Sequence, residues 1–110
     1  MPSLPYYAVI FTSVRTDVDE GYLETNELLM KKAHEYEGFL HQDAVRDGIG
    51  IAISYWRDLE SIIEWRKDSD HILAKGRGKK EWYRQYSVRI AKVESEYGMS
   101  GVEYSADNNH

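Results

Sequence analysis

The sequence predicts an α+β domain with the order β-α-β-β-α-β, the ferredoxin-like arrangement in which helices cover one face of an antiparallel sheet. Three observations support this prediction. Short runs of β-branched and aromatic residues alternate with two segments of helical periodicity. The dipeptide Asp47-Gly48 separates two of these runs, as is typical of a β-hairpin. The chain has 110 residues, which is room for one such domain.

The first half of the chain predicts a strand and a helix. The run from Tyr6 to Val14 is rich in β-branched and aromatic residues, so we expect a strand. Residues 21–37 repeat apolar side chains at helical spacing. Asp17 or Asp19 is the candidate N-cap of this helix, and Gly38 is the expected helix stop.

The second half predicts the hairpin, a second helix and a last strand. The three expected strands cover residues 39–46, 49–56 and 86–93. Asp58 is the candidate N-cap of the second helix. Gly76 and Gly78 are expected to divide the helical segment 69–83 into two short pieces. On the strand 49–56, the small residues Gly50, Ala52 and Ser54 share one face, which allows another group to approach closely.

Composition sets limits on the function. The chain carries 14 Lys and Arg against 19 Asp and Glu, a formal charge of −5. This balance argues against a nucleic-acid partner, because phosphate binding needs a concentrated basic surface. Because cysteine is absent, disulfides, thiolate metal sites and cysteine nucleophiles are excluded. We predict no metal and no cofactor, since the adjacent Asp68, Asp70 and His71 are typical of a solvated helix surface.

The expected domain covers residues 6–98, preceded by a short lead of residues 1–5 and followed by a flexible tail of residues 99–110. No apolar run approaches the ~18 residues of a membrane span. The N-terminus also lacks a signal-peptide pattern. We therefore expect a cytoplasmic protein without a membrane partner. The sheet face away from the helices would carry many apolar and aromatic side chains, so we expect a homodimer that pairs these faces and encloses a cavity.

Aromatic side chains and one histidine gather in the second half of the chain. The cluster comprises Trp56, Trp65, His71, Trp82, Tyr83 and Tyr86. Trp65 and His71 are six residues apart, so they share a pocket only if the helix breaks near residues 68–70. A histidine in such a pocket can move a proton near neutral pH.

The segment from Ile53 to Trp65, with the sequence ISYWRDLESIIEW, resembles the signature of antibiotic biosynthesis monooxygenase domains. The opening strand and the later Asp70-His71, Glu81-Trp82-Tyr83 and Tyr86–Arg89 segments are similar to one bacterial branch of that family. The resemblance covers about residues 6–98. It implies a dimeric α/β-barrel and, for the members that oxidise phenols, a reaction with O2 that uses neither metal nor flavin.

The resemblance also suggests residue roles. Trp65 and His71 match the pocket Trp and a pocket polar residue of the quinone-forming members, whereas a pocket Asn of those members falls near Ser61. The haem-degrading pattern is broken, because Lys75 stands where those relatives carry a histidine. The candidate catalytic residues are His71 as base and Arg89, or Arg84, as partner of the substrate anion. The candidate substrate-binding residues are Tyr7, Tyr55, Trp65, Trp82, Tyr83 and Tyr86.

Two other functions compete with oxidation of a small aromatic or phenolic compound. RNA-recognition domains share the element order, but their third strand carries base-stacking aromatic residues where this chain has Ile49, Ile51 and Ile53. The second alternative is a non-catalytic, small-ligand-binding or stress-related homodimer of the same fold. Both the oxygenase and the binding protein need an apolar pocket with a few polar groups.

Overall fold

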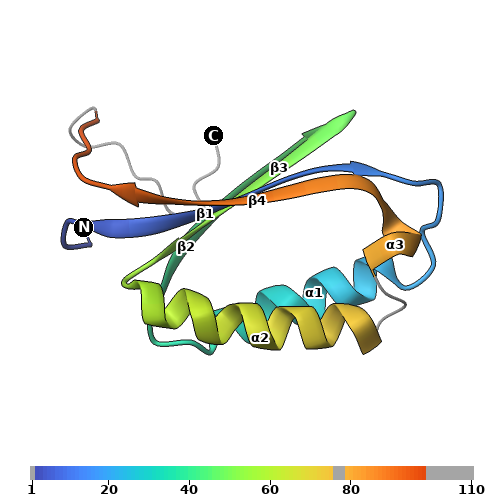
Figure 1. Cartoon of the computed structure of the whole chain (residues 1–110), viewed down its shortest axis with the longest axis horizontal. Coiled ribbons are helices and arrows are strands. Elements are labelled where there is room, and N and C mark those ends of the chain that lie inside the picture. Colours follow the sequence, from blue (N-terminus) through green and yellow to red (C-terminus); the bar gives the residue numbers. More distant parts are fainter. Residues whose placement is uncertain (1, 76–78, 99–110) are drawn as a thin grey trace.

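The structure is a computed structural model that describes residues 2–75 and 79–98. The expected tail, residues 99–110, lies outside these ranges, as do Gly76 and Gly78. The predicted ferredoxin-like order is confirmed, with one short extra helix before the last strand (Figure 1). The elements are β1 (Tyr6–Arg15), α1 (Tyr22–His34), β2 (Phe39–Asp47), β3 (Ile49–Trp56), α2 (Leu59–Lys75), α3 (Lys79–Trp82) and β4 (Tyr83–Val93).

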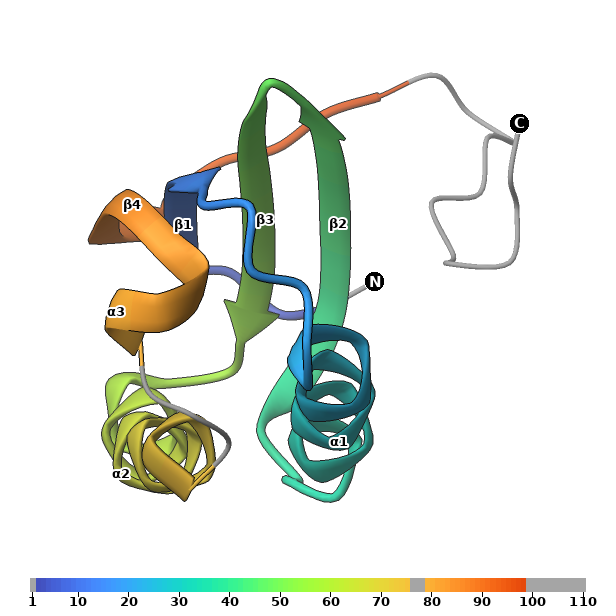
Figure 2. The same cartoon turned by 90° about the vertical axis from the view of Figure 1, so that its right-hand side faces the viewer.

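The four strands form one antiparallel sheet in the order β2-β3-β1-β4. Both long helices lie on the same side of this sheet (Figure 1). Viewed along the helices, α1 lies below β2 and β3, and α2 lies below β1 and β4 (Figure 2). The sheet therefore has a helix side and an outer side, and alternating residues of each strand point to one or the other.

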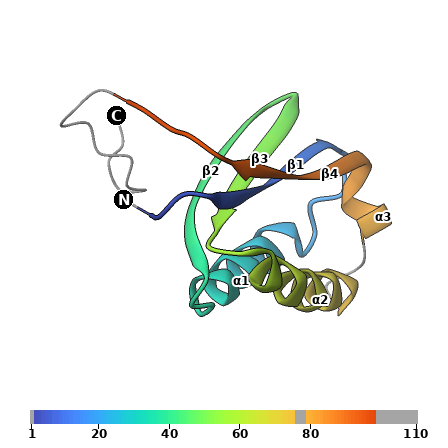
Figure 3. The same ribbon diagram turned by 60° about the vertical axis from the view of Figure 1, so that its left-hand side comes forward.

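The hairpin predicted at Asp47-Gly48 is confirmed. Gly48 has a φ of 82°, in the left-handed region that glycine enters without steric cost. Across the turn Arg46 pairs with Gly50, and the tip of the hairpin points away from the helices (Figure 3). This register places the small residues Gly50, Ala52 and Ser54 on the helix side.

The predicted ends of α1 are wrong at both termini. Gly21, with a φ of 81°, occupies the N-cap position, and no side chain caps the helix. The carboxylate of Asp19 is instead 2.9 Å from the guanidinium of Arg15. The helix ends at His34, before Gly38. Gly38 instead allows β2 and α2 to approach closely, because a Cβ atom at this position would overlap the side chain of Ser61 on α2.

The predicted N-cap of α2 is confirmed, since the Asp58 carboxylate accepts a hydrogen bond of 2.8 Å from the Ser61 backbone N–H. A hydrogen bond with the Ser61 side chain, the backbone hydrogen bond and the neighbouring Arg57 together hold the pKa of Asp58 below its usual range. The expected break near residues 68–70 is wrong, because α2 runs unbroken to Lys75. The interruption predicted at Gly76 and Gly78 falls outside the described residues, and β4 begins at Tyr83 rather than at Tyr86.

Two tryptophans, both 0% exposed, form the packed regions at the two ends of the sheet. Trp56 packs with Ala33, Ile62 and the rings of Phe39 and Tyr36. Its indole nitrogen donates a hydrogen bond of 2.8 Å to the Ser54 hydroxyl.

Trp82 is the last residue of α3, directly before β4. Its indole nitrogen donates a hydrogen bond of 3.0 Å to the carbonyl of Glu20. Its ring packs edge-on against Tyr22. Trp56 and Trp82 therefore join the helices to the sheet at two separate places.

The outer side of the sheet exposes apolar side chains near the hairpin. Val45, Ile49 and Ile51 are 66%, 55% and 40% exposed, and the sheet register places them on that side. Within residues 2–75 and 79–98, no helix is both long and apolar enough to cross a membrane.

Candidate functional site

A cavity of about 490 Å3 lies between the helix side of the sheet and the two long helices. Its floor on β3 is formed by Gly50, Ala52 and Ser54, the small residues that the sequence placed on one face. Because these side chains are short, they leave space between the packed regions of Trp56 and Trp82. The volume is in the range of ligand-binding pockets in proteins.

Aromatic rings form the walls of this cavity. The ring of Phe11 on β1 stacks on Tyr86 at a centroid distance of 5.6 Å and meets Tyr83 edge-on at 5.3 Å. At the other end, Trp65 on α2 stacks on Trp56 at 5.8 Å. Phe11, Trp65, Tyr83 and Tyr86 all line the cavity, so a planar apolar molecule would find aromatic surface at both ends.

A pair of tyrosine hydroxyls supplies polar groups inside this aromatic wall. Tyr22 on α1 and Tyr83 on β4 both line the cavity, and their side chains are hydrogen-bonded. Burial, together with this hydrogen bond, raises the pKa of Tyr83 above its usual value, although the positive charges of Arg46 and Arg15 oppose the shift. Tyr83 is therefore a neutral hydrogen-bond donor at physiological pH.

Exposed polar residues lie at the rim of the cavity. Asn26 on α1, Arg66 and Asp70 on α2, and Arg46 on β2 line the cavity and are exposed. The cavity is therefore connected to solvent along this rim, and a small molecule can enter without unfolding the domain.

Sequence reasoning missed Arg46 and Ser13. Arg46 lines the cavity, and its Nη2 donates a hydrogen bond of 2.6 Å to the hydroxyl of Ser13, which is 2% exposed. The local sequence did not identify them, because a two-residue turn at Asp47-Gly48 would pair Arg46 with Ile49, whereas the observed register pairs Arg46 with Gly50. Gly50 in turn pairs with Ser13 on β1.

Three of the predicted substrate-binding residues line the cavity, namely Trp65, Tyr83 and Tyr86. They come from α2 and β4, so only the tertiary fold brings them together. Tyr7 packs against the Trp56 core instead. Trp82 is fully buried and donates a hydrogen bond to the Glu20 carbonyl, so it belongs to the packed core rather than to the cavity wall.

Two predicted residues lie on the outer side of the sheet. Tyr55 stacks on His41 at a centroid distance of 6.0 Å and pairs with Ala8 in the sheet register. Arg89 pairs with Ile10 and donates a hydrogen bond of 3.0 Å to the Ser87 hydroxyl. The sheet itself separates both side chains from the cavity.

His71 also lies away from the cavity. It is exposed on α2 and borders a separate depression with Tyr36, Glu64, Lys67 and Asp68. Because α2 is continuous at 3.6 residues per turn, positions six apart point in different directions, and Trp65 and His71 do not converge. The catalytic roles of His71 and Arg89 stay predictions, without a cavity contact to support them.

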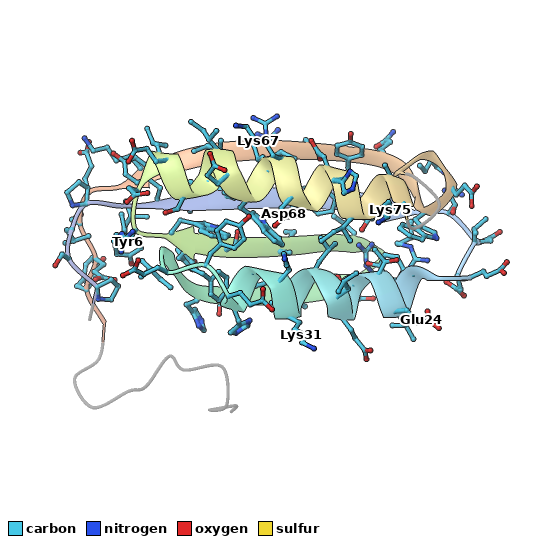
Figure 4. All side chains as sticks on the ribbon, turned by 90° about the horizontal axis from the view of Figure 1, so that it is seen from below. Tyr6, Glu24, Lys31, Lys67, Asp68 and Lys75 are labelled. Carbon is cyan, nitrogen blue, oxygen red and sulfur yellow. The ribbon has the colours of Figure 1, made fainter. Side chains whose placement is uncertain are left out.

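The depression beside His71 is organised by a tyrosine and a carboxylate. The Tyr36 hydroxyl donates a hydrogen bond of 2.7 Å to Asp68, which lies on the side of α2 that faces α1 (Figure 4). Burial and the bonded carboxylate raise the pKa of Tyr36 to about 12. In the described part of the chain, no three His, Cys, Asp or Glu side chains gather as a metal site would require.

Comparisons with known proteins connect this geometry to a family. No protein-family model matches the chain. The uncharacterised protein YqjZ of Bacillus subtilis is 46% identical over 95 residues, which are 84% of this chain and 83% of YqjZ. The jasmonate monooxygenase ABM of Pyricularia oryzae is 27% identical over 92 residues, covering 79% of this chain. The chain belongs to the same protein family as YqjZ. The predicted resemblance to antibiotic biosynthesis monooxygenase (ABM) domains is confirmed by its similarity to ABM proteins.

A solved structure shares the fold of this chain. A Nitrosomonas europaea protein assigned as an antibiotic biosynthesis monooxygenase superposes with a TM-score of 0.61 at 14% identity, over 83% of this chain and 91% of that one. This similarity confirms the ABM-type fold. The chain spans less than half, 43%, of the jasmonate monooxygenase, so that enzyme's activity is not carried over with the family.

Proposed function

We propose that this chain is a monooxygenase that oxidises a small aromatic or phenolic compound with O2 inside the cavity. The observation that carries the proposal is an aromatic-walled cavity of about 490 Å3 with a hydrogen-bonded tyrosine pair in its wall. The names of the ABM relatives support the same class of reaction.

The proposed reaction converts a phenol and O2 into a quinone and water. One oxygen atom enters the carbon ring and the other leaves as water, while the ring supplies all four electrons. The phenol first loses its proton to solvent at the exposed rim, and the electron-rich phenolate then reduces O2. Trp65, Phe11 and Tyr86 would hold the ring, and the O–H that the Tyr22–Tyr83 pair does not use internally would be donated to the oxyanion.

Oxygen uptake by the purified protein tests this function. We expect one of a panel of phenols, naphthols and hydroxyanthrones to consume O2 in a one-to-one ratio. With 18O2, one labelled atom should appear in the quinone. The variant Trp65→Ala, which removes one wall, should lower the turnover of that compound about tenfold or more, a loss of about 1.4 kcal/mol.

The same assay separates the oxygenase from the binding protein of the same fold. Saturable binding of a phenol without any O2 uptake across the panel would reject oxidation and support the ligand-binding alternative. Parallel measurements on His71→Ala and Arg89→Ala test the sequence-based assignments, since only a group that acts in the reaction gives a loss of turnover with binding retained.

We also propose that two copies pair through the outer side of the sheet. The exposed Ile49, Ile51 and Val45 on that side support this, because soluble monomers rarely expose a contiguous apolar patch to water. Native mass spectrometry should give twice the 12.8 kDa chain mass. Ile51→Asp should shift the protein to monomer, whereas the control Ile63→Asp, on exposed α2 surface, should not. A monomeric wild type would reject the dimer.

A further inference from the structure

We propose that the molecule bound in the cavity carries a carboxylate and that Arg46 is the residue that holds it. This inference rests on the proposed use of the cavity as the ligand site, but it does not depend on the oxidation step. It assigns a class of ligand, an aromatic carboxylate, to a site whose other walls are aromatic.

The position of Arg46 is determined by the central strand of the sheet. Nη2 donates a hydrogen bond of 2.6 Å to the Ser13 hydroxyl, and Nη1 donates one of 3.4 Å to the Ser13 carbonyl. Ser13 is 2% exposed on β1, between β3 and β4. The guanidinium of this exposed edge-strand residue is therefore directed across β3 toward β1, at the rim of the cavity.

Gly50 makes this position possible. A Cβ atom on Gly50 would overlap the guanidinium carbon and nitrogens of Arg46, so the guanidinium lies directly against the backbone of β3. Because residue 50 is glycine, β3 has no side chain where Arg46 crosses it. On the opposite edge of β1, Ser13 pairs with Tyr86 of β4, which belongs to the aromatic wall.

The guanidinium retains unused hydrogen-bonding capacity. An arginine has five N–H donors, and Ser13 accepts from two of the Arg46 nitrogens. Within residues 2–75 and 79–98, no carboxylate lies within 4.0 Å of Arg46. A planar carboxylate matches a guanidinium with paired hydrogen bonds, so the remaining donors of Arg46 suit a carboxylate that enters the cavity at this rim.

Arg15, the other arginine near Tyr83, differs from Arg46 in how its donors are used. Its charge also acts on Tyr83, but its guanidinium is already used within the protein. It donates to the carbonyls of Trp82 and Val18, pairs with Asp19, and lies 3.5 Å from the ring centroid of Tyr22. Of these two arginines near Tyr83, Arg46 is the one with donors left for a ligand.

The dimensions of the cavity fit a ligand that joins an aromatic ring to an acid. The floor from Gly50 to Ser54 spans roughly 13 Å, taking about 3.3 Å per strand residue. Arg46 lies beside Gly50, and Ser54 lies near Trp65 through their shared neighbour Trp56. Fused rings against Trp65 and Phe11 could therefore extend a carboxylate to Arg46.

Calorimetric titration with 2-naphthoate and with its neutral isostere 2-naphthamide tests this inference. We expect the wild type to bind naphthoate at least tenfold more tightly than naphthamide. Arg46→Gln should lower naphthoate affinity at least tenfold and leave naphthamide affinity within twofold. Lys31→Gln, which removes the same charge from the exposed surface of α1, should change neither affinity.

A second variant tests the position of the guanidinium while the net charge stays constant. Gly50→Ala displaces the Arg46 side chain, so we expect it to lose naphthoate affinity in the same direction as Arg46→Gln. Equal wild-type affinities for naphthoate and naphthamide would overturn the inference. An unchanged naphthoate affinity in Arg46→Gln would also overturn it, as would a loss caused by Arg66→Gln instead.

Failure of this inference and failure of the oxygenase proposal give different results. Naphthoate binding that depends on Arg46, without O2 uptake on any phenol, would support the carboxylate site and reject oxidation. Oxidation of neutral phenols by a protein that does not distinguish naphthoate from naphthamide would support the oxygenase and overturn the carboxylate site.

Discussion

Replacing Trp56 by alanine is expected to lower the free energy of unfolding by about 3–5 kcal/mol, the usual cost of removing a buried aromatic side chain. Trp56 is 0% exposed and packs with Phe39, Tyr36 and Trp65 at centroid distances of 5.2, 6.0 and 5.8 Å. Its loss would leave a hole at the junction of α1, α2 and the sheet. Urea unfolding followed by far-UV circular dichroism measures this change.

The neighbouring tryptophan provides the matched control. Trp65 is only partly buried and borders the existing cavity, so Trp65→Ala should cost clearly less stability than Trp56→Ala. Should Trp56→Ala fail to fold, Trp56→Phe, which keeps part of the ring packing, allows the comparison. Equal losses for the two alanine variants would contradict the division between a packed core at Trp56 and a ligand wall at Trp65.

Replacing Ala52 by phenylalanine is expected to lower ligand affinity and turnover by about 100-fold, or about 2.7 kcal/mol. Ala52 lies in the middle of the cavity floor, paired with Phe11 on β1 and Ala44 on β2. A phenyl ring there would occupy the space between the aromatic walls. Calorimetry with 2-naphthoate and oxygen uptake with an accepted phenol measure the loss.

Ala52→Ser is the control for this substitution, because it adds one small polar atom and leaves the cavity open. Circular dichroism should show that Ala52→Phe retains the secondary structure of the wild type. Full binding by folded Ala52→Phe would mean that the ligand sits elsewhere on the protein, and the functional assignment of this cavity would be wrong.

The elements of the fold were predictable where local patterns decide them. The β-branched run of β1, the Asp47-Gly48 turn and the Asp58 cap of α2 all depend on interactions within a few residues. The prediction failed at α1, where Asp19 pairs with Arg15 rather than capping the helix. It also failed at Gly38, where the close approach of Ser61 accounts for the glycine.

The candidate site was predictable only in part, because its residues come from six elements. Trp65, Tyr83 and Tyr86 stood out as aromatic residues, and the structure brings all three to the cavity. His71 was chosen for its chemistry, but the unbroken α2 turns it toward a different surface. Arg46 was overlooked because its role depends on the long-range pairing of β1 with β3.

The sequence by itself determined the fold class, the position of the hairpin turn and the row of small residues at Gly50, Ala52 and Ser54, since these follow from strand alternation and turn chemistry. Only the tertiary structure decided that the cavity lies between the sheet and its own helices, and that Arg46 rather than Arg89 reaches it. The physical reason is that a side chain's face along a strand is a local property. The group it meets depends on which distant strands and helices pack against that face.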